Sequence, residues 1–180
     1  MAFAQGKVYT LEDIYNLPEG QRAELIDGKI YYMAPPSRIH QDISMFLSKT
    51  ISNYIDYKSD SCKVYAAPFA VFLNEDDNNY LEPDLSIICT PSKLDDKGCH
   101  GAPDWIIEIT SPGTKQMDYG IKLFKYRTAR VREYWIVDPK QKRIMIWNFE
   151  HNTMEEYTFF DTVAAGICDD LIIDFSKLKL

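Results

Sequence analysis

Two acidic residues stand where the surrounding sequence predicts buried strands. Glu108 lies inside the apolar run of residues 105–109, and Asp84 lies at the entrance of the apolar run of residues 85–89. Short apolar runs of this kind are typical of central strands that are covered on both faces. A buried ionised carboxylate is costly unless a partner offsets its charge. The sequence therefore predicts that Glu108 has a partner that offsets its charge.

Neighbouring central strands would bring the two carboxylates together. Two carboxylates at close range repel, and one of them takes up a proton unless a cation intervenes. Mg²⁺ prefers one or two carboxylates together with water and phosphate oxygens. Asp84 and Glu108 thus predict a divalent-metal site suited to phosphodiester hydrolysis, in which the metal polarises the phosphate and lowers the pKa of the attacking water.

A lysine on the next helix could complete such a site. Asp118, Lys122 and Tyr126 are spaced four apart, so they share one face of a helix that follows the Glu108 strand and must pack near it. Lys122 could then orient the attacking water or stabilise the developing charge. Ordinary alternatives exist, because Lys122 could pair with Asp118 on an exposed face and Glu108 could point to solvent from an edge strand.

The order of the expected elements favours a mixed α/β (α+β) fold, a central mixed β-sheet flanked by helices. Periodicity and turn residues predict helices at 10–17, 37–57 and 115–129, a hairpin at 23–33 and a long polar loop at 90–104. They also predict strands at 62–67, 69–73, 85–89, 105–110, 133–138, 143–149, 154–160 and within 169–178. The unit from Trp105 to Asp138 should be a parallel strand–helix–strand crossover. With 180 residues, 46% of them apolar, the size predicts one domain over 1–180.

Composition narrows the class of protein. A net charge of −7 argues against a protein that coats nucleic acid generally. One segment departs from this, because nine Lys and Arg face three Asp and Glu from Lys115 to Arg143, which could be a solvated face or a phosphate-facing surface. The sequence predicts no signal peptide and no membrane span. The four scattered cysteines favour neither a disulfide framework nor a zinc site, and fit a reducing cytoplasm.

Several segments, in order, resemble one family. "EPDLSII", then "WIIEITSPGT" with the later Asp118, Lys122 and Tyr126, then "VREYWIVDP", resemble the PD-(D/E)xK restriction-endonuclease-like superfamily. Within it the chain is similar to the Uma-two family. The segment "AELIDGKIYYMAPPSRIH" near the start of the chain also resembles the opening of that family. The resemblance covers roughly residues 8 to 150. It implies a restriction-endonuclease-like core and Mg²⁺-dependent (or Mn²⁺-dependent) cleavage of DNA.

The resemblance also implies a set of site residues. Asp84 and Glu108 would be the metal carboxylates, Lys122 the catalytic lysine and Glu24 an additional acid, with His40, Asp118 and Tyr126 in support. The superfamily pattern expects a lysine two residues after Glu108, where this chain has Thr110. The chain is similar in this respect to nucleases whose lysine has moved to the following helix, which indicates Lys122. Lys115 is a weaker candidate because it lies at the start of that helix and off the face of Asp118 and Tyr126. Glu82, next to Pro83, is expected to face away.

Three functional hypotheses follow. The first is a metal-dependent DNA endonuclease, expected as a homodimer because two strands need two sites. The second is a catalytically inactive nucleic-acid-binding or regulatory module on a nuclease scaffold, since fold alone does not establish function. The third is a component whose activity needs a partner, which an exposed apolar patch on the C-terminal hairpin would support.

Overall fold

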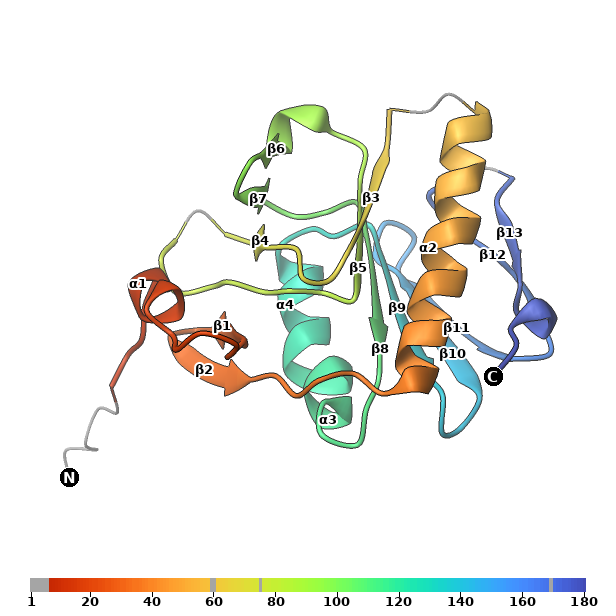
Figure 1. Ribbon diagram of the computed structural model, residues 1–180. Coiled ribbons are helices and arrows are strands. Elements are labelled where there is room, and N and C mark those ends of the chain that lie inside the picture. The colour runs from red at the N-terminus through yellow and green to blue at the C-terminus, as the bar shows by residue number, and fades with distance from the viewer. Residues whose placement is uncertain (1–6, 59–60, 75, 169) are drawn as a thin grey trace.

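The fold is organised around a mixed sheet, seen in a computed structural model that describes residues 7–58, 61–74, 76–168 and 170–180 (Figure 1). Residues 1–6, at the N-terminus, are not among the residues that the structure describes. The six strands, in spatial order, are β11 (Thr153–Thr158), β10 (Arg143–Asn148), β9 (Glu133–Asp138), β8 (Trp105–Ile109), β5 (Leu85–Ile88) and β3 (Lys63–Ala66). Strands β8 and β9 are parallel and the other pairs are antiparallel. The predicted mixed sheet and its flanking helices are confirmed.

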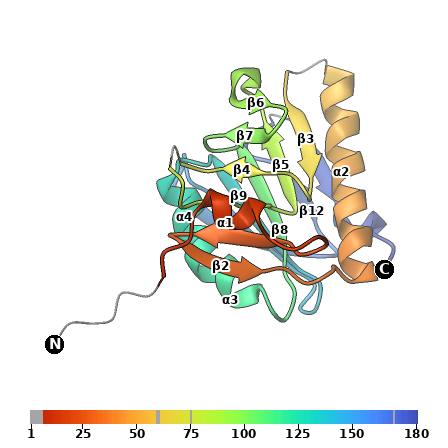
Figure 2. The ribbon, with the colours of Figure 1, turned by 60° about the vertical axis from the view of Figure 1, so that its left-hand side comes forward.

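Helices cover both faces of this sheet. Helix α2 (Arg38–Lys58) lies along one face, and the segment of α3 (Lys115–Met117) and α4 (Leu123–Thr128) lies on the other (Figures 1 and 2). The buried stripe of α2 repeats at helical spacing, as an amphipathic helix requires: Ile43, Leu47, Ile51 and Ile55. Each sheet face thus packs on its own apolar core.

Strand alternation decides which core each residue of β8 enters. Trp105, Ile107 and Ile109 belong to the core under α2, whereas Ile106 belongs to the core under α4. Successive side chains of a strand point to opposite faces, so Glu108 shares the α4 face with Ile106. The single charged residue of β8 is therefore directed at the helical segment that follows it.

The N-terminal elements form a small lobe beside α4 (Figure 2). Helix α1 (Leu11–Tyr15) begins after Thr10, whose backbone N–H donates to Asp13 Oδ2 at 2.9 Å. Strands β1 (Ala23–Ile26) and β2 (Lys29–Tyr32) form the predicted hairpin. Its turn places Asp27 and Gly28 at φ 49° and 71°, the left-handed pair that two-residue hairpins favour.

Three features differ from the sequence-based expectation. The helix predicted at 115–129 is interrupted by a π-helical turn, Asp118–Lys122, between α3 and α4. The loop at 90–104 contains β6 (Leu94–Asp95) and β7 (Gly98–His100), and β7 pairs with both β6 and β4 (Val71–Phe72) in a separate sheet. An additional strand, β12 (Thr162–Ala164), pairs with β13 (Ile172–Asp174).

The cysteines also differ from expectation. Cys62 and Cys89 form a disulfide, while Cys99 and Cys168 are free and buried. The two bonded residues flank the paired positions Lys63 and Ile88, so the antiparallel register of β3 and β5 brings them face to face. The expectation of no disulfide framework did not anticipate this bond, because sequence spacing does not reveal a cross-strand neighbour. No helix among the described residues is long and apolar enough to cross a membrane.

Candidate active site

The sheet pairing brings the two predicted carboxylate strands together. Strands β5 and β8 are antiparallel neighbours, with Leu85 opposite Ile107. Asp84, just before β5, accepts a hydrogen bond at Oδ2 from the backbone N–H of Ile109 at 2.7 Å. The backbone N–H of Asp84 in turn approaches Glu108 Oε2 at 3.5 Å. The two acidic side chains therefore meet at one end of the β5–β8 pair, as expected.

Glu108 has two buried partners from the helical segment. Lys122 Nζ lies 3.0 Å from Glu108 Oε1, and the hydroxyl of Tyr126 donates to the same oxygen at 2.7 Å. Glu108 and Lys122 are 3% and 4% exposed. The two alternatives with Glu108 in solvent or Lys122 on an exposed helix face are thereby excluded.

Glu24 completes the cluster from the N-terminal lobe. Lys122 Nζ lies 2.8 Å from Glu24 Oε2, and Glu24 Oε1 accepts from the backbone N–H of Glu82 at 3.1 Å. The hairpin is held there because Leu25 and Tyr80 exchange two backbone hydrogen bonds, at 2.7 and 2.8 Å. One lysine thus bridges carboxylates that are far apart in the sequence.

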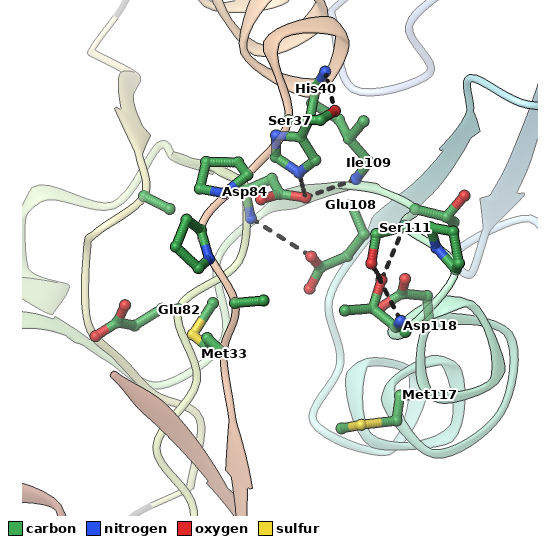
Figure 3. Close-up of a pocket in the computed structure, with 18 of the residues that line it drawn as sticks. Met33, Ser37, His40, Glu82, Asp84, Glu108, Ile109, Ser111, Met117 and Asp118 are labelled. Atoms are coloured by element: carbon green, nitrogen blue, oxygen red, sulfur yellow. Dashed lines mark hydrogen bonds and ion pairs between the residues drawn. The ribbon is translucent and has the colours of Figure 1, made fainter. Parts of the chain in front are cut away.

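His40 and Asp118 lie on either side of the cluster (Figure 3). His40, in the first turn of α2, places Nε2 3.1 Å from Asp84 Oδ2. Its backbone N–H donates to Ser37 Oγ at 3.2 Å, so Ser37 caps the start of this helix. Asp118 is 1% exposed, and its Oδ1, 3.9 Å from Lys122 Nζ, has no hydrogen-bond partner.

The π turn positions these last residues. Asp118 and Lys122 are its first and last residues, and both are buried. The carbonyl of Asp118 accepts from the hydroxyl of Tyr134 at 3.0 Å, which fixes the start of the turn against β9. Single π turns inside α-helices are frequent at functional sites. The sequence offered Gly120 as its one local signal, which was not sufficient to predict the turn.

The electrostatics of the cluster are dominated by burial and by mutual repulsion of the acids. Burial, and then the charges of Asp84, Asp118 and Glu24, raise the pKa of Glu108 well above its usual value, with Lys122 opposing. Burial also raises the pKa of Asp118 to about 6. Burial alone would lower the pKa of Lys122, but Glu108, Glu24 and Asp118 together raise it well above the usual value. Lys122 is therefore a permanent cation among acids that need more positive charge than it supplies.

The cluster opens into a cavity of about 840 Å³. Six of the seven sequence-predicted site residues line it, and Tyr126 lies behind Glu108. Thr110, at the position where the superfamily pattern expects lysine, lines it as well. Lys115 does not; its Nζ binds Asp138 Oδ2 at 2.7 Å, which accords with the preference for Lys122.

Two residues that line the cavity were not predicted from the sequence. Glu82 lines the cavity instead of facing away, so that expectation was wrong. It accepts from Arg22 Nε at 2.8 Å and from the hydroxyl of Tyr80 at 2.8 Å. Arg22 also lines the cavity. The pair joins segments 60 residues apart, and no local pattern marks such a contact.

The donor set suits a hard divalent cation, although it is incomplete as it stands. No group of three or more His, Cys, Asp or Glu side chains within the described ranges is arranged to hold a metal ion. Asp84 and Glu108 nevertheless offer carboxylate oxygens at one end of the β5–β8 pair, and one oxygen of Asp118 has no hydrogen-bond partner. Mg²⁺ commonly takes only one or two protein carboxylates and completes its shell with water and phosphate. The residues therefore fit Mg²⁺ or Mn²⁺ better than a soft metal.

Comparisons with known proteins bear on the fold and the family of this chain. A crystal structure described as a "putative nuclease belonging to DUF820", from Anabaena variabilis, superimposes with a TM-score of 0.77 over 94% of this chain and 96% of that one, at 19% identity. The chain therefore shares the fold of that protein, a central mixed sheet flanked by helices. The family model Uma2, "Putative restriction endonuclease", matches residues 10–175. The chain belongs to the Uma2 family.

One curated relative is similar over a shorter stretch. It is an uncharacterized protein, slr1290, from Synechocystis sp. (strain ATCC 27184 / PCC 6803 / Kazusa), 26% identical over 129 residues. The match covers 71% of this chain and 66% of the relative, just under two thirds of its length. Its printed description assigns it no activity.

Proposed function

We propose that residues 1–180 form one nuclease domain that hydrolyses phosphodiester bonds in DNA with the aid of Mg²⁺ or Mn²⁺. The observation that carries this proposal is the bridge of Lys122 between Glu24 and Glu108, beside Asp84, at the inner end of a cavity. Membership of the Uma2 family supports the reaction class. The bound metal would polarise the phosphate and lower the pKa of an attacking water.

Asp84 and Glu108 are the residues assigned to the metal. Asp84 is held in place by the backbone N–H of Ile109 and by His40, so its carboxylate is oriented before any ligand arrives. Glu108 is oriented by Tyr126. Burial and the neighbouring acids raise the pKa of Glu108, and the charge of a bound metal would oppose that rise.

Lys122 is assigned to charge stabilisation. Because its pKa is raised, the ammonium stays protonated at neutral pH and donates hydrogen bonds instead of accepting a proton. It can hold the attacking water or the phosphate oxygen on which negative charge develops. Glu24 fixes the position of that ammonium, with Asp118 3.9 Å away.

Cleavage of plasmid and oligonucleotide DNA tests the proposal. Lys122→Met should lower the Mg²⁺-dependent or Mn²⁺-dependent rate by at least about a hundredfold, because one preorganised charge contact is lost. Lys115→Met is the matched control from the same helical segment, and its rate should stay within about twofold of the wild-type rate, since Lys115 binds Asp138 outside the cavity. A folded wild-type protein that cuts no DNA with either metal would favour the inactive binding module.

A homodimer in the cytoplasm belongs to the same proposal. Duplex cleavage needs two sites, and Met154 and Phe160 of the C-terminal hairpin region are exposed at the outer edge of the sheet. Light scattering of the purified chain measures the oligomeric state. The disulfide of Cys62 and Cys89 removes one reason for expecting a reducing compartment.

A further inference from the structure

We infer, resting on the proposed function, that the DNA strand which reaches Glu108 is unpaired, and that one of its bases lies against an apolar wall of the cavity. The wall consists of Tyr31, Met33, Pro35 and Pro36, and Met117 lies across the hollow from Met33. The preferred substrate would then be single-stranded or locally opened DNA.

The first reason is the depth of the acidic cluster. Glu24, Glu108, Asp118 and Lys122 are all nearly buried, so a phosphate meets them only from inside the cavity. The volume of about 840 Å³ lies within the size range of pockets that take one small molecule. Duplex DNA is a stiff rod whose bases are stacked and paired, and it cannot fold into such a space. Enzymes that work in enclosed pockets act on single strands or take the nucleotide out of the stack.

The second reason is the apolar wall, which no part of the metal or lysine chemistry requires. Tyr31 is opposite Glu24 in the β1–β2 register, so both side chains share one face of the hairpin. Figure 3 shows Met33 and Met117 on opposite sides of the hollow, with Glu108 between them in this view. Aromatic and apolar side chains beside a backbone-binding site are the usual means of holding an unpaired base.

The third reason is charge. Duplex-binding proteins contact several phosphates over a broad basic surface. Here four of the nine cations in residues 115–143 pair with acids outside the cavity: Lys115 with Asp138, Lys125 with Asp27, Arg132 with Glu150 and Arg143 with Glu156. The cations that line the cavity within the described chain are Arg22, Lys122 and Lys140. This number suits the phosphates of one short strand better than those of a duplex.

Binding of matched DNA forms tests the inference without turnover. Fluorescence anisotropy, with Ca²⁺ in place of Mg²⁺, compares one oligonucleotide as a single strand and as a blunt duplex. The single strand should bind at least about tenfold more tightly. Equal or tighter binding of the duplex would overturn the inference, and this comparison needs no variant.

A variant tests the wall itself. Tyr31→Leu should weaken single-strand binding by about tenfold and reduce the change in fluorescence of a 2-aminopurine base within the strand. The matched control is Tyr57→Ala, a tyrosine that is 84% exposed and does not line the cavity, and it should leave both signals unchanged. If Tyr31→Leu does not fold by circular dichroism, Met33→Glu replaces it with the same expected loss. Undiminished binding by the folded variant contradicts the assignment of the wall.

The inference and the nuclease proposal fail in different ways. A protein that prefers single strands but cuts no DNA with Mg²⁺ or Mn²⁺ loses the nuclease proposal and keeps this one. A protein that nicks closed duplex circles as fast as it cuts single-stranded circles loses this inference and remains a nuclease.

Discussion

Lys122 Nζ lies 3.0 Å from Glu108 Oε1, and the two residues reach each other only because strand β8 runs into a helix that packs back on the same sheet face. Both side chains are buried, and Glu24 joins them from a separate hairpin. A buried lysine with more than one acidic partner holds its charge, while the acids compete for it. This imbalance is the basis of the predictions that follow.

Removing the lysine should destabilise the metal-free protein, whereas neutralising Glu108 should not. Lys122→Met leaves Glu24, Glu108 and Asp118 without their common cation, so the free energy of unfolding at pH 8 should fall by roughly 3–5 kcal/mol. Glu108→Gln keeps the shape of the side chain and leaves Lys122 paired with Glu24. Its free energy of unfolding should therefore differ from the wild-type value by less than about 1 kcal/mol. Urea denaturation in EDTA measures both. A larger loss in Glu108→Gln than in Lys122→Met would show that the acids are not in excess.

Stability should fall as pH rises through the range in which Asp118 loses its proton. The pKa of Asp118 is about 6 in the folded protein against an ordinary value of 3.8, mainly because of burial. The folded state therefore binds more protons than the unfolded state between these values, and the free energy of unfolding decreases with pH across that window. The decrease should reach about 3 kcal/mol at most. Denaturation from pH 4 to 7 in EDTA should show this slope of unfolding free energy against pH in the wild type and a smaller slope in Asp118→Asn. Equal slopes in the two proteins would contradict the assignment to Asp118.

Divalent metal should stabilise the fold, and more so at higher pH. Saturation at a hundred times the Kd raises the free energy of unfolding by about 2.7 kcal/mol. Protons compete for Glu108, whose pKa is raised by burial and by its acidic neighbours, so metal binds more weakly at pH 5.5 than at pH 8. Thermal denaturation with Mn²⁺ should show an upward shift of Tm. The shift should vanish in Asp84→Asn, and its persistence there would move the metal away from the assigned pair.

The number of free thiols should depend on reduction. The chain has four cysteines, and Cys62 and Cys89 are bonded to each other. Thiol titration of the urea-unfolded protein should give two groups, Cys99 and Cys168, before reduction and four after it. Four groups in protein purified without reductant would show that the bond does not form in solution.

The fold was predictable where local patterns are strong. The stripe of α2, the Asp27–Gly28 turn and the apolar runs of β5 and β8 each follow from periodicity or turn chemistry. The β4–β7–β6 sheet and strand β12 were not predicted, because their strands are only two or three residues long. The π turn was missed because hydrogen-bond register inside a helix leaves no clear trace in side-chain pattern.

The residues of the candidate site were recognisable by position, but their contacts were not. Asp84 and Glu108 stood out because acids are rare in apolar strands, and Lys122 because it shares a helix face with Asp118 and Tyr126. The bridge to Glu24 spans 98 residues and depends on how the N-terminal hairpin docks. Glu82 and Cys89 were misjudged for the same reason, since each contacts a residue that is distant in sequence.

The most direct test of the central claim compares wild-type protein and Glu108→Gln in metal-dependent DNA cleavage. The substitution removes one negative charge at the centre of the cluster and preserves the size of the side chain. We predict that the variant folds normally and that its cleavage rate in Mg²⁺ or Mn²⁺ falls by at least about a hundredfold. Equal cleavage by the two proteins would contradict the assignment of this cluster as the active site.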